Sequence, residues 1–246
     1  MIRLNKFLSE AGVCSRREAD KLIEQGTIKV NGKRATLGMQ VDETMEVKVG
    51  KKVISEGAEK IVLAFNKPSG IVCTENRRDR NNIIKYIGYP KRITYAGRLD
   101  KESEGLMIMT NDGDLIQHMM RAVNGHEKEY KVTVDKEITK EFLSSMSKGV
   151  HIVDEEKKID AVTRTSKVTQ IGKYTFSIIL TQGLNRQIRR MCEALGYNVR
   201  KLLRIRIMNI KLGNLPIGKY RELTKEELDG LYGDERENEG ASLPFK

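Results

Sequence analysis

Short runs of alternating or continuous apolar residues, with helical spacing between only some of them, constrain the fold of this chain most strongly. Residues 130–134 alternate as a half-buried strand does, and residues 106–110 and 174–180 are apolar runs of strand length. Residues 185–195 place their apolar side chains on one helical face. Because strands and helices do not alternate regularly, we expect an α+β fold with a mainly antiparallel, mixed sheet flanked by helices.

The charge of the chain indicates a polyanionic partner. The 246 residues include 45 Lys and Arg against 34 Asp and Glu, which gives a net charge of +11 and a pI near 9.5. Residues 181–211 carry eight basic residues against the single acid Glu193. A nucleic acid is the simplest partner for such a distribution.

Several classes of protein are excluded by what the sequence lacks. Cys14, Cys73 and Cys192 are far apart and there are three histidines, so we expect neither a disulfide framework nor a metal site. The sequence has no GxGxxG and no GxxxxGK[ST], so we expect no dinucleotide, P-loop or other cofactor. No apolar run approaches the roughly 20 residues of a membrane span, and no signal peptide is evident. We expect a cytoplasmic monomer without membrane contact.

The first 60 residues predict two helices and a hairpin. Apolar residues recur at helical spacing from Leu4 to Ala11, and residues 15–18 (Ser-Arg-Arg-Glu) form a capping box for a second helix. Asn31-Gly32 is a strong hairpin-turn signal, and alternation over residues 45–49 closes a small sheet.

This helix-helix-hairpin arrangement over residues 2–49 resembles the S4 RNA-binding domain, which we assign to residues 1–56. Two of its arginines lie in the first turn of a helix, where the helix dipole disfavours cations but where phosphate would be bound. The alternative is a charged accessory domain whose basic residues are only solvated. The RNA-binding interpretation predicts contacts from Lys6, Arg16, Arg17 and Lys33.

A second domain is expected over residues 61–232. Residues 50–60 are polar and suit a linker, and residues 61–65 suit a buried strand. A turn at 66–70 (Asn-Lys-Pro-Ser-Gly) then leads into a second strand at 71–73. Residues 233–246 are acidic and poor in large apolar residues, which predicts a disordered tail.

Two dense motifs in this second domain could carry chemistry. In residues 95–105, Asp100 lies in a charged loop just before an apolar strand; the alternative is an aspartate that only makes a turn with its own backbone. In residues 182–191, Arg186, Arg189 and Arg190 gather near the start of a helix, where they are unfavourable without an acidic partner. The alternative here is a basic face that lies on RNA phosphates without a catalytic role.

Together these motifs resemble those of the pseudouridine synthases, in the branch typified by the RsuA enzyme of small-subunit rRNA and its large-subunit relatives. The resemblance follows family order through residues 66–70, Gly-Arg-Leu-Asp at 97–100, the strand entry at 127–130 and residues 185–190 (Asn-Arg-Gln-Ile-Arg-Arg). Leu184 stands where most members have arginine. With residues 125–130, it is similar to the RluF subgroup, which belongs to the large-subunit branch.

The resemblance implies roles for individual residues. Asp100 matches the catalytic aspartate, which must be ionised to attack the nucleotide or assist departure of the base. Arg189 matches the arginine that pairs with this aspartate. Tyr130 matches the tyrosine that packs on the target base; the alternative is a tyrosine buried in its strand. Arg98 matches the arginine that fills the space left by a flipped uridine, although it could equally hold a phosphate. From the alternation of the strand itself, Arg204 and Arg206 would offer two cations to the substrate backbone.

We therefore expect an RNA pseudouridine synthase that acts on a structured stem-loop, above all in large-subunit (23S) rRNA. A tRNA stem-loop is an alternative substrate. Two other classes remain: a non-enzymatic S4 protein of the ribosome, which would not explain Asp100, and an RNA N-glycosidase, which would release free uracil.

Overall fold

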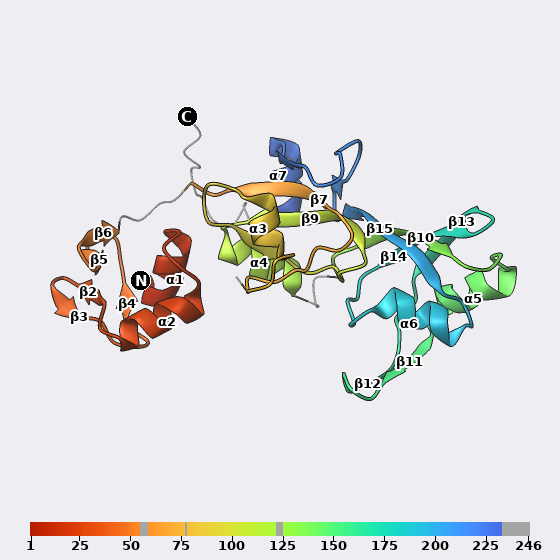
Figure 1. Ribbon diagram of the computed structural model, residues 1–246, viewed down its shortest axis with the longest axis horizontal. Coiled ribbons are helices and arrows are strands. Elements are labelled where there is room, and N and C mark those ends of the chain that lie inside the picture. Colours follow the sequence, from red (N-terminus) through yellow and green to blue (C-terminus); the bar gives the residue numbers. More distant parts are fainter. Residues whose placement is uncertain (55–58, 77, 122–124, 233–246) are drawn as a thin grey trace.

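The computed structural model describes residues 1–54, 59–76, 78–121 and 125–232. The tail expected to be disordered, residues 233–246, lies outside the described residues. Figure 1 shows a small N-terminal unit at one end of the long axis and a larger sheet that extends to the other end. None of the helices in the described part of the chain is long and apolar enough to cross a membrane.

The N-terminal unit has the two helices and the hairpin that the sequence predicts. Ser15 caps the second helix by accepting a hydrogen bond from the amide of Glu18 (3.2 Å), and Asn31 and Gly32 have the positive φ angles, 48° and 77°, of a tight hairpin turn. A compact apolar core joins helices and strands. The elements are β1 (Ile2–Arg3), α1 (Leu4–Glu10), α2 (Arg16–Glu24), β2 (Ile28–Val30), β3 (Lys33–Arg34), β4 (Gln40–Val41), β5 (Val47–Val49) and β6 (Lys52–Ile54).

The expected linker at residues 50–60 is partly wrong. Lys52–Ile54 forms β6, which pairs antiparallel with β5, and Ile54 is buried in the core of the N-terminal unit. The sequence signal was weak because two of these three residues, Lys52 and Val53, are exposed. The N-terminal unit therefore includes residues that composition alone assigns to a connection.

The larger unit is built on a nine-stranded sheet among the described residues, with a main path β13-β14-β10-β15-β9-β7-β17 to which β8 and β16 are added. Every described ladder in it is antiparallel except the one between β15 and β9. The mainly antiparallel, mixed α+β fold is therefore confirmed. The strands are β7 (Val62–Lys67), β8 (Thr94–Ala96), β9 (Glu104–Thr110), β10 (Lys128–Val134), β13 (Lys167–Gly172), β14 (Thr175–Leu180), β15 (Val199–Ile207), β16 (Ile210–Lys211) and β17 (Tyr220–Glu222).

Helices cover both halves of this sheet, and a separate two-stranded hairpin, β11–β12, lies beside α6 (Figure 1). The prediction of a strand at residues 71–73 is wrong. Val72 forms a single isolated bridge with Asn82, because Asn82 caps α3 and the chain continues from it into that helix. The helices are α3 (Ile83–Ile87), α4 (Gly113–Met120), α5 (Lys140–Lys148), α6 (Gln187–Ala194) and α7 (Lys225–Tyr232), and the hairpin strands are β11 (His151–Asp154) and β12 (Ile159–Val162).

The two halves of the sheet have separate apolar cores. One core packs α5 and α6 on β10 and β14, while two others lie on opposite faces of β7 and β9. Tyr130 packs against cores of both halves. The backbones of the halves pair where Leu203 and Arg204 of β15 lie beside Glu104 and Gly105 of β9, and Ile207 of β15 packs into one of the cores on β7 and β9. The centre of the sheet is therefore a junction of two packed bodies.

Gly105 tests how tightly this junction is packed. It has φ of +107°, and an added Cβ would lie 2.3 Å from the carbonyl oxygen of Arg204. We expect Gly105→Ala to lower the free energy of unfolding by about 3 kcal/mol or more, because strain and overpacking add. Gly213→Ala is the matched control: it has φ of +54° with nothing within 4 Å of an added Cβ, so we expect about 1–2 kcal/mol. Urea unfolding of both variants measures the difference, and equal losses would contradict the close packing.

Candidate active site

Asp100 lies in the loop between β8 and β9, at the junction of the two half-sheets. The loop is anchored on both sides of it: the buried Leu99 donates its amide to Sγ of Cys73 (3.4 Å), and the amide of Ser103 donates to the Asp100 carbonyl (3.1 Å). The Asp100 side chain is half-buried and forms no hydrogen bond or ion pair with any described residue. A fixed backbone thus carries an unengaged carboxylate.

A buried lysine holds this loop from below. Lys67 ends β7 and has no exposed surface, and its ammonium donates to the carbonyls of Ser103 (2.7 Å), Pro68 (2.9 Å) and Lys101 (3.4 Å). Burial lowers the pKa of Lys67, while nearby acidic groups that include Asp100 act in the opposite direction. Lys67 therefore joins the end of β7 to the loop of Asp100 and places a positive charge near the carboxylate.

The second motif reaches the same loop from α6. Arg186 has the left-handed φ of 52° at the position before the helix, and its guanidinium forms an ion pair with Glu102 (3.0 Å). A backbone hydrogen bond and this arginine lower the pKa of Glu102. The helix begins at Gln187, two residues later than the sequence predicts, because Arg186 turns the chain into it. The structure therefore brings the two sequence motifs together.

The expected ion pair between Arg189 and Asp100 is absent from the described residues. Arg189 instead directs Nη2 to Oγ of Ser103 (3.4 Å) and Nη1 to the carbonyl of Val199 (3.4 Å), and its buried Nε has no partner. The turn between Asp100 and Ser103 explains why Arg189 contacts Ser103 and not Asp100, because the turn directs the Ser103 side chain towards α6. Arg189 nevertheless touches both half-sheets beside the Asp100 loop.

Tyr130 and Arg98 lie on different sides of the junction. Tyr130 is half-buried on β10, opposite Arg204 of β15, and packs between the two cores. Arg98 is exposed, two residues before Asp100, and has no described partner. An aromatic side chain, an unengaged carboxylate and an accessible cation thus lie around one junction.

Family models match both units of the chain. The model described as RNA pseudouridylate synthase matches residues 61–194, which is more than half of the chain and includes Asp100, Tyr130 and Arg189. The chain belongs to the RNA pseudouridylate synthase family. The S4 domain model matches residues 2–47, so the N-terminal unit is an S4 domain. The protein is accordingly an isomerase.

Named relatives agree with this membership. The chain is 51% identical to "Dual-specificity RNA pseudouridine synthase RluF" of Escherichia coli (strain K12), over 94% of this chain and 78% of the relative. It is 35% identical to "Ribosomal large subunit pseudouridine synthase B" of Salmonella typhimurium, over 94% of this chain and 82% of the relative. The solved structure titled "Crystal structure of pseudouridylate synthase" matches with a TM-score of 0.68 at 28% identity, covering 94% of this chain and all of that one.

The two strand arginines of this synthase do not form the exposed pair that the sequence predicts. Arg204 is 2% exposed and cannot reach a phosphate in this structure. Arg206 is half-buried and paired with Glu127 (2.9 Å) and Glu129 (3.0 Å). A register shift in the β10–β15 ladder places Arg204 opposite Tyr130 and Arg206 opposite Glu129. The two arginines, which are two residues apart on β15, therefore face adjacent residues of β10. Simple alternation along one strand could not reveal this.

The other predicted RNA contacts differ in how free they are. Arg16, Arg17 and Lys33 are exposed on the S4 domain and form no hydrogen bond or ion pair with a described side chain. Arg190 is held on α6 by Asp154 of β11 and by Asn185. Arg16, Arg17 and Lys33 can bind phosphates directly, whereas Arg190 would first have to break its contacts with Asp154 and Asn185.

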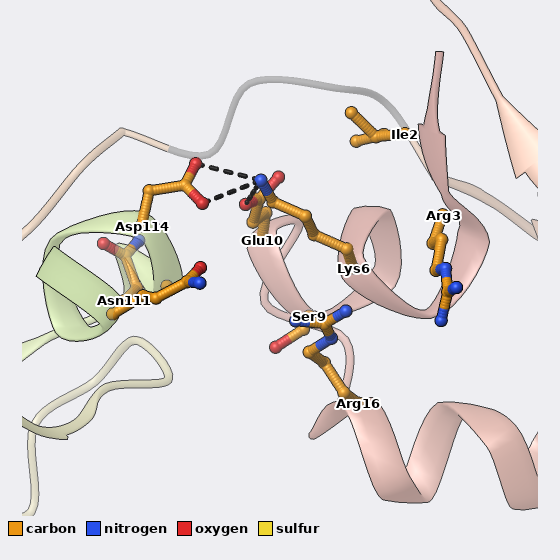
Figure 2. Close-up of a pocket in the computed structure, with 10 residues that line it drawn as sticks. Ile2, Arg3, Lys6, Ser9, Glu10, Arg16, Asn111 and Asp114 are labelled. Carbon is orange, nitrogen blue, oxygen red and sulfur yellow. Dashed lines mark hydrogen bonds and ion pairs between the residues drawn. The ribbon is translucent and has the colours of Figure 1, made fainter. Parts of the chain in front are cut away.

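Lys6 bridges the S4 domain and the synthase domain. Figure 2 shows its side chain extending from α1 towards Asp114 at the start of α4. Its ammonium lies 2.8 Å from Asp114 and 3.6 Å from Glu10, and the hydrogen bond to Asp114 raises the pKa of Lys6. Because exposed ion pairs contribute only about 0–1 kcal/mol, an RNA phosphate can compete with Asp114 for this lysine.

Sequence reasoning did not assign Lys67 and Glu102 to the site. The sequence places Lys67 in a turn, yet its position directly after an apolar run (Ile-Val-Leu-Ala-Phe-Asn-Lys) was a usable signal, because a lysine that continues a buried strand needs polar partners. The pairing of Glu102 with Arg186 spans 84 residues and left no local signal.

Replacing Lys67 tests its support of the Asp100 loop. We expect Lys67→Met to lower the free energy of unfolding by about 2–4 kcal/mol, because buried carbonyls lose their donor. Lys101→Met is the control, since its exposed side chain can change with an effect within about 0.5 kcal/mol. Urea unfolding measures both variants. A Lys67→Met protein as stable as the control would show that the three carbonyl contacts contribute nothing.

Proposed function

We propose that this synthase converts a uridine to pseudouridine in a structured stem-loop of large-subunit rRNA, with Asp100 as its catalytic residue. The observation that carries the proposal is the Asp100 carboxylate, fixed by its backbone yet unengaged by any described side chain. The names of relatives at 35–51% identity support an RNA target, and one of them names the ribosomal large subunit.

The reaction breaks the bond from ribose C1′ to N1 of uracil and forms one from C1′ to C5. The hydrogen on C5 leaves as a proton and N1 gains one, so no electrons are exchanged with a co-reactant. The Asp100 carboxylate would attack the nucleotide or assist departure of the base. Lys67 lies close enough to Asp100 for their charges to interact, and Arg189 binds Ser103 in the same loop.

Tyr130 and Arg98 would handle the flipped nucleotide. Tyr130 presents an aromatic ring at the junction of the two cores, where it can pack on a uracil. Arg98 is exposed and unpaired among the described residues, so it can enter the space that the uridine leaves, which offsets part of the unstacking cost. Both residues therefore act on binding and orientation.

A tRNA stem-loop is the second candidate substrate. The RluF relative is described as having dual specificity, and a stem-loop that offers the same local structure would meet the same site. Because these RNA substrates lie inside the cell, we further propose that the protein is cytoplasmic. We also propose that it acts as a monomer, in which the S4 domain supplies affinity for RNA and the synthase domain carries out the reaction.

The first test is release of tritium from uracil C5 of RNA prepared from a strain that lacks the gene. We expect wild-type protein to release tritium and Asp100→Asn to release none while its Kd for RNA stays within about twofold, because the amide keeps the shape of the side chain. Separate rRNA and tRNA samples identify the substrate. Release by Asp100→Asn would refute the catalytic role, and release from tRNA alone would refute the rRNA target.

Salt dependence tests the S4 contacts. We expect Arg17→Gln to weaken RNA binding and to reduce the slope of log K against log salt by about 0.7–0.9, which is one phosphate contact. The fold should remain intact, because a cation at a helix N-terminus adds no stability. Lys225→Gln removes the same charge from an exposed position on α7. Equal slopes for the two variants would argue against a phosphate contact at Arg17.

A further inference from the structure

The two half-sheets are joined by the β15–β9 ladder, which is the shortest ladder along the main path of the described sheet. The β15–β9 ladder has two residue pairs, whereas β7–β9 has six and β10–β15 has seven. It is also the one parallel ladder described in this sheet. Few backbone hydrogen bonds therefore fix one half of the sheet relative to the other.

The candidate catalytic groups lie on opposite sides of this junction. Asp100 belongs to the loop that leads into β9, whereas Tyr130 lies on β10, beyond β15. The separation of the two groups is thus set across the junction. Displacement of reacting groups by about 1 Å can cost about 100-fold in rate.

Arg204 crosses the junction with its side chain. It lies on β15, and its guanidinium donates from Nε to the Leu106 carbonyl of β9 (2.7 Å) and from Nη2 to Sδ of Met107 (3.0 Å). The side chain is 2% exposed and pairs with no carboxylate among the described residues. A planar guanidinium with two fixed contacts holds an orientation that a flexible aliphatic chain would not hold.

An unpaired buried cation is costly, so its presence calls for a specific gain. Aliphatic side chains of similar volume often replace buried charges at no loss of stability. At this position the backbones also approach closely, since a Cβ on Gly105 would lie 2.3 Å from the Arg204 carbonyl oxygen. The ion pair of Lys201 with Glu104 (3.1 Å) lies next to it. Side chain and backbone contacts thus converge on one point of the junction.

We propose that Arg204 is a positioning residue: by tying β15 to β9 it fixes Asp100 relative to Tyr130. The inference rests on the catalytic role proposed for Asp100. The Arg204 backbone lies directly opposite Tyr130 in the β10–β15 ladder, and its side chain bonds to β9, the strand that follows the Asp100 loop, so one residue links the two strands that position these groups. It replaces the expectation that Arg204 contacts the RNA backbone.

Turnover measured separately from RNA affinity tests this proposal. With saturating RNA, we expect Arg204→Met to lower kcat by about 10–100-fold while Kd stays within about twofold. Arg204→Lys keeps one donor and should recover part of kcat. Arg221→Met is the matched control: Arg221 also reaches another strand's carbonyl, at Lys211, and is ion-paired with Glu227, but it lies on the edge strand β17. We expect its kcat within about twofold of wild type.

The possible outcomes separate the hypotheses. If Arg204→Met keeps wild-type kcat, or if Arg204→Met does not fold and Arg204→Lys keeps wild-type kcat, the positioning role is wrong. If Kd rises and the salt slope falls while kcat is unchanged, Arg204 contacts RNA instead. Asp100→Asn is assayed in parallel. If Asp100→Asn turns over, the proposed function fails together with this inference, whereas an inactive Asp100→Asn beside a fully active Arg204→Met overturns the inference alone.

Discussion

The buried ammonium of Lys67 is the interaction on which the candidate site depends. Its three carbonyl contacts join the end of β7 to the loop that carries Asp100, which is also anchored by the buried Leu99. The other residues of this loop are mostly polar, and a charged donor with several acceptors supports their backbone where apolar packing does not. The cost of burying the charge is partly offset by those acceptors and by nearby acidic groups such as Asp100.

The site is also a consequence of how the sheet is assembled. Each half of the sheet packs mainly on its own apolar core, and the halves meet through two β15–β9 residue pairs, through Tyr130 and through Ile207 of β15, which packs with β7 and β9. Packed cores are rigid, whereas a short ladder between them is the place where relative position is least constrained. Three side chains that cross the junction, Arg186, Arg189 and Arg204, add contacts at that place. Catalytic geometry and sheet assembly are therefore one problem in this fold.

Positive charge in this protein serves two different purposes. The exposed Arg16, Arg17 and Lys33 are available to a polyanion. By contrast, Arg186, Arg190 and Arg206 pair with acidic side chains from other segments, and these pairs fix α6, β11 and β15. The net charge of +11 therefore overstates the number of cations that are free to meet RNA. Composition indicates the partner, and pairing decides which residues can reach it.

The sequence by itself determined the local elements, the α+β class and the segments that carry the site. The capping serine at Ser15, the Asn31-Gly32 turn and the alternation over residues 130–134 are local signals, and the structure confirms each of them. Only the tertiary structure decided which charges are paired, that Arg204 is buried, that Arg189 faces Ser103 and not Asp100, and that residues 52–54 complete a sheet. The physical reason is that helix caps and turns depend on neighbours within a few residues. Ion pairs and strand neighbours, by contrast, join positions as far apart in the chain as Phe65 and Tyr220, whose approach depends on the packing of the whole chain.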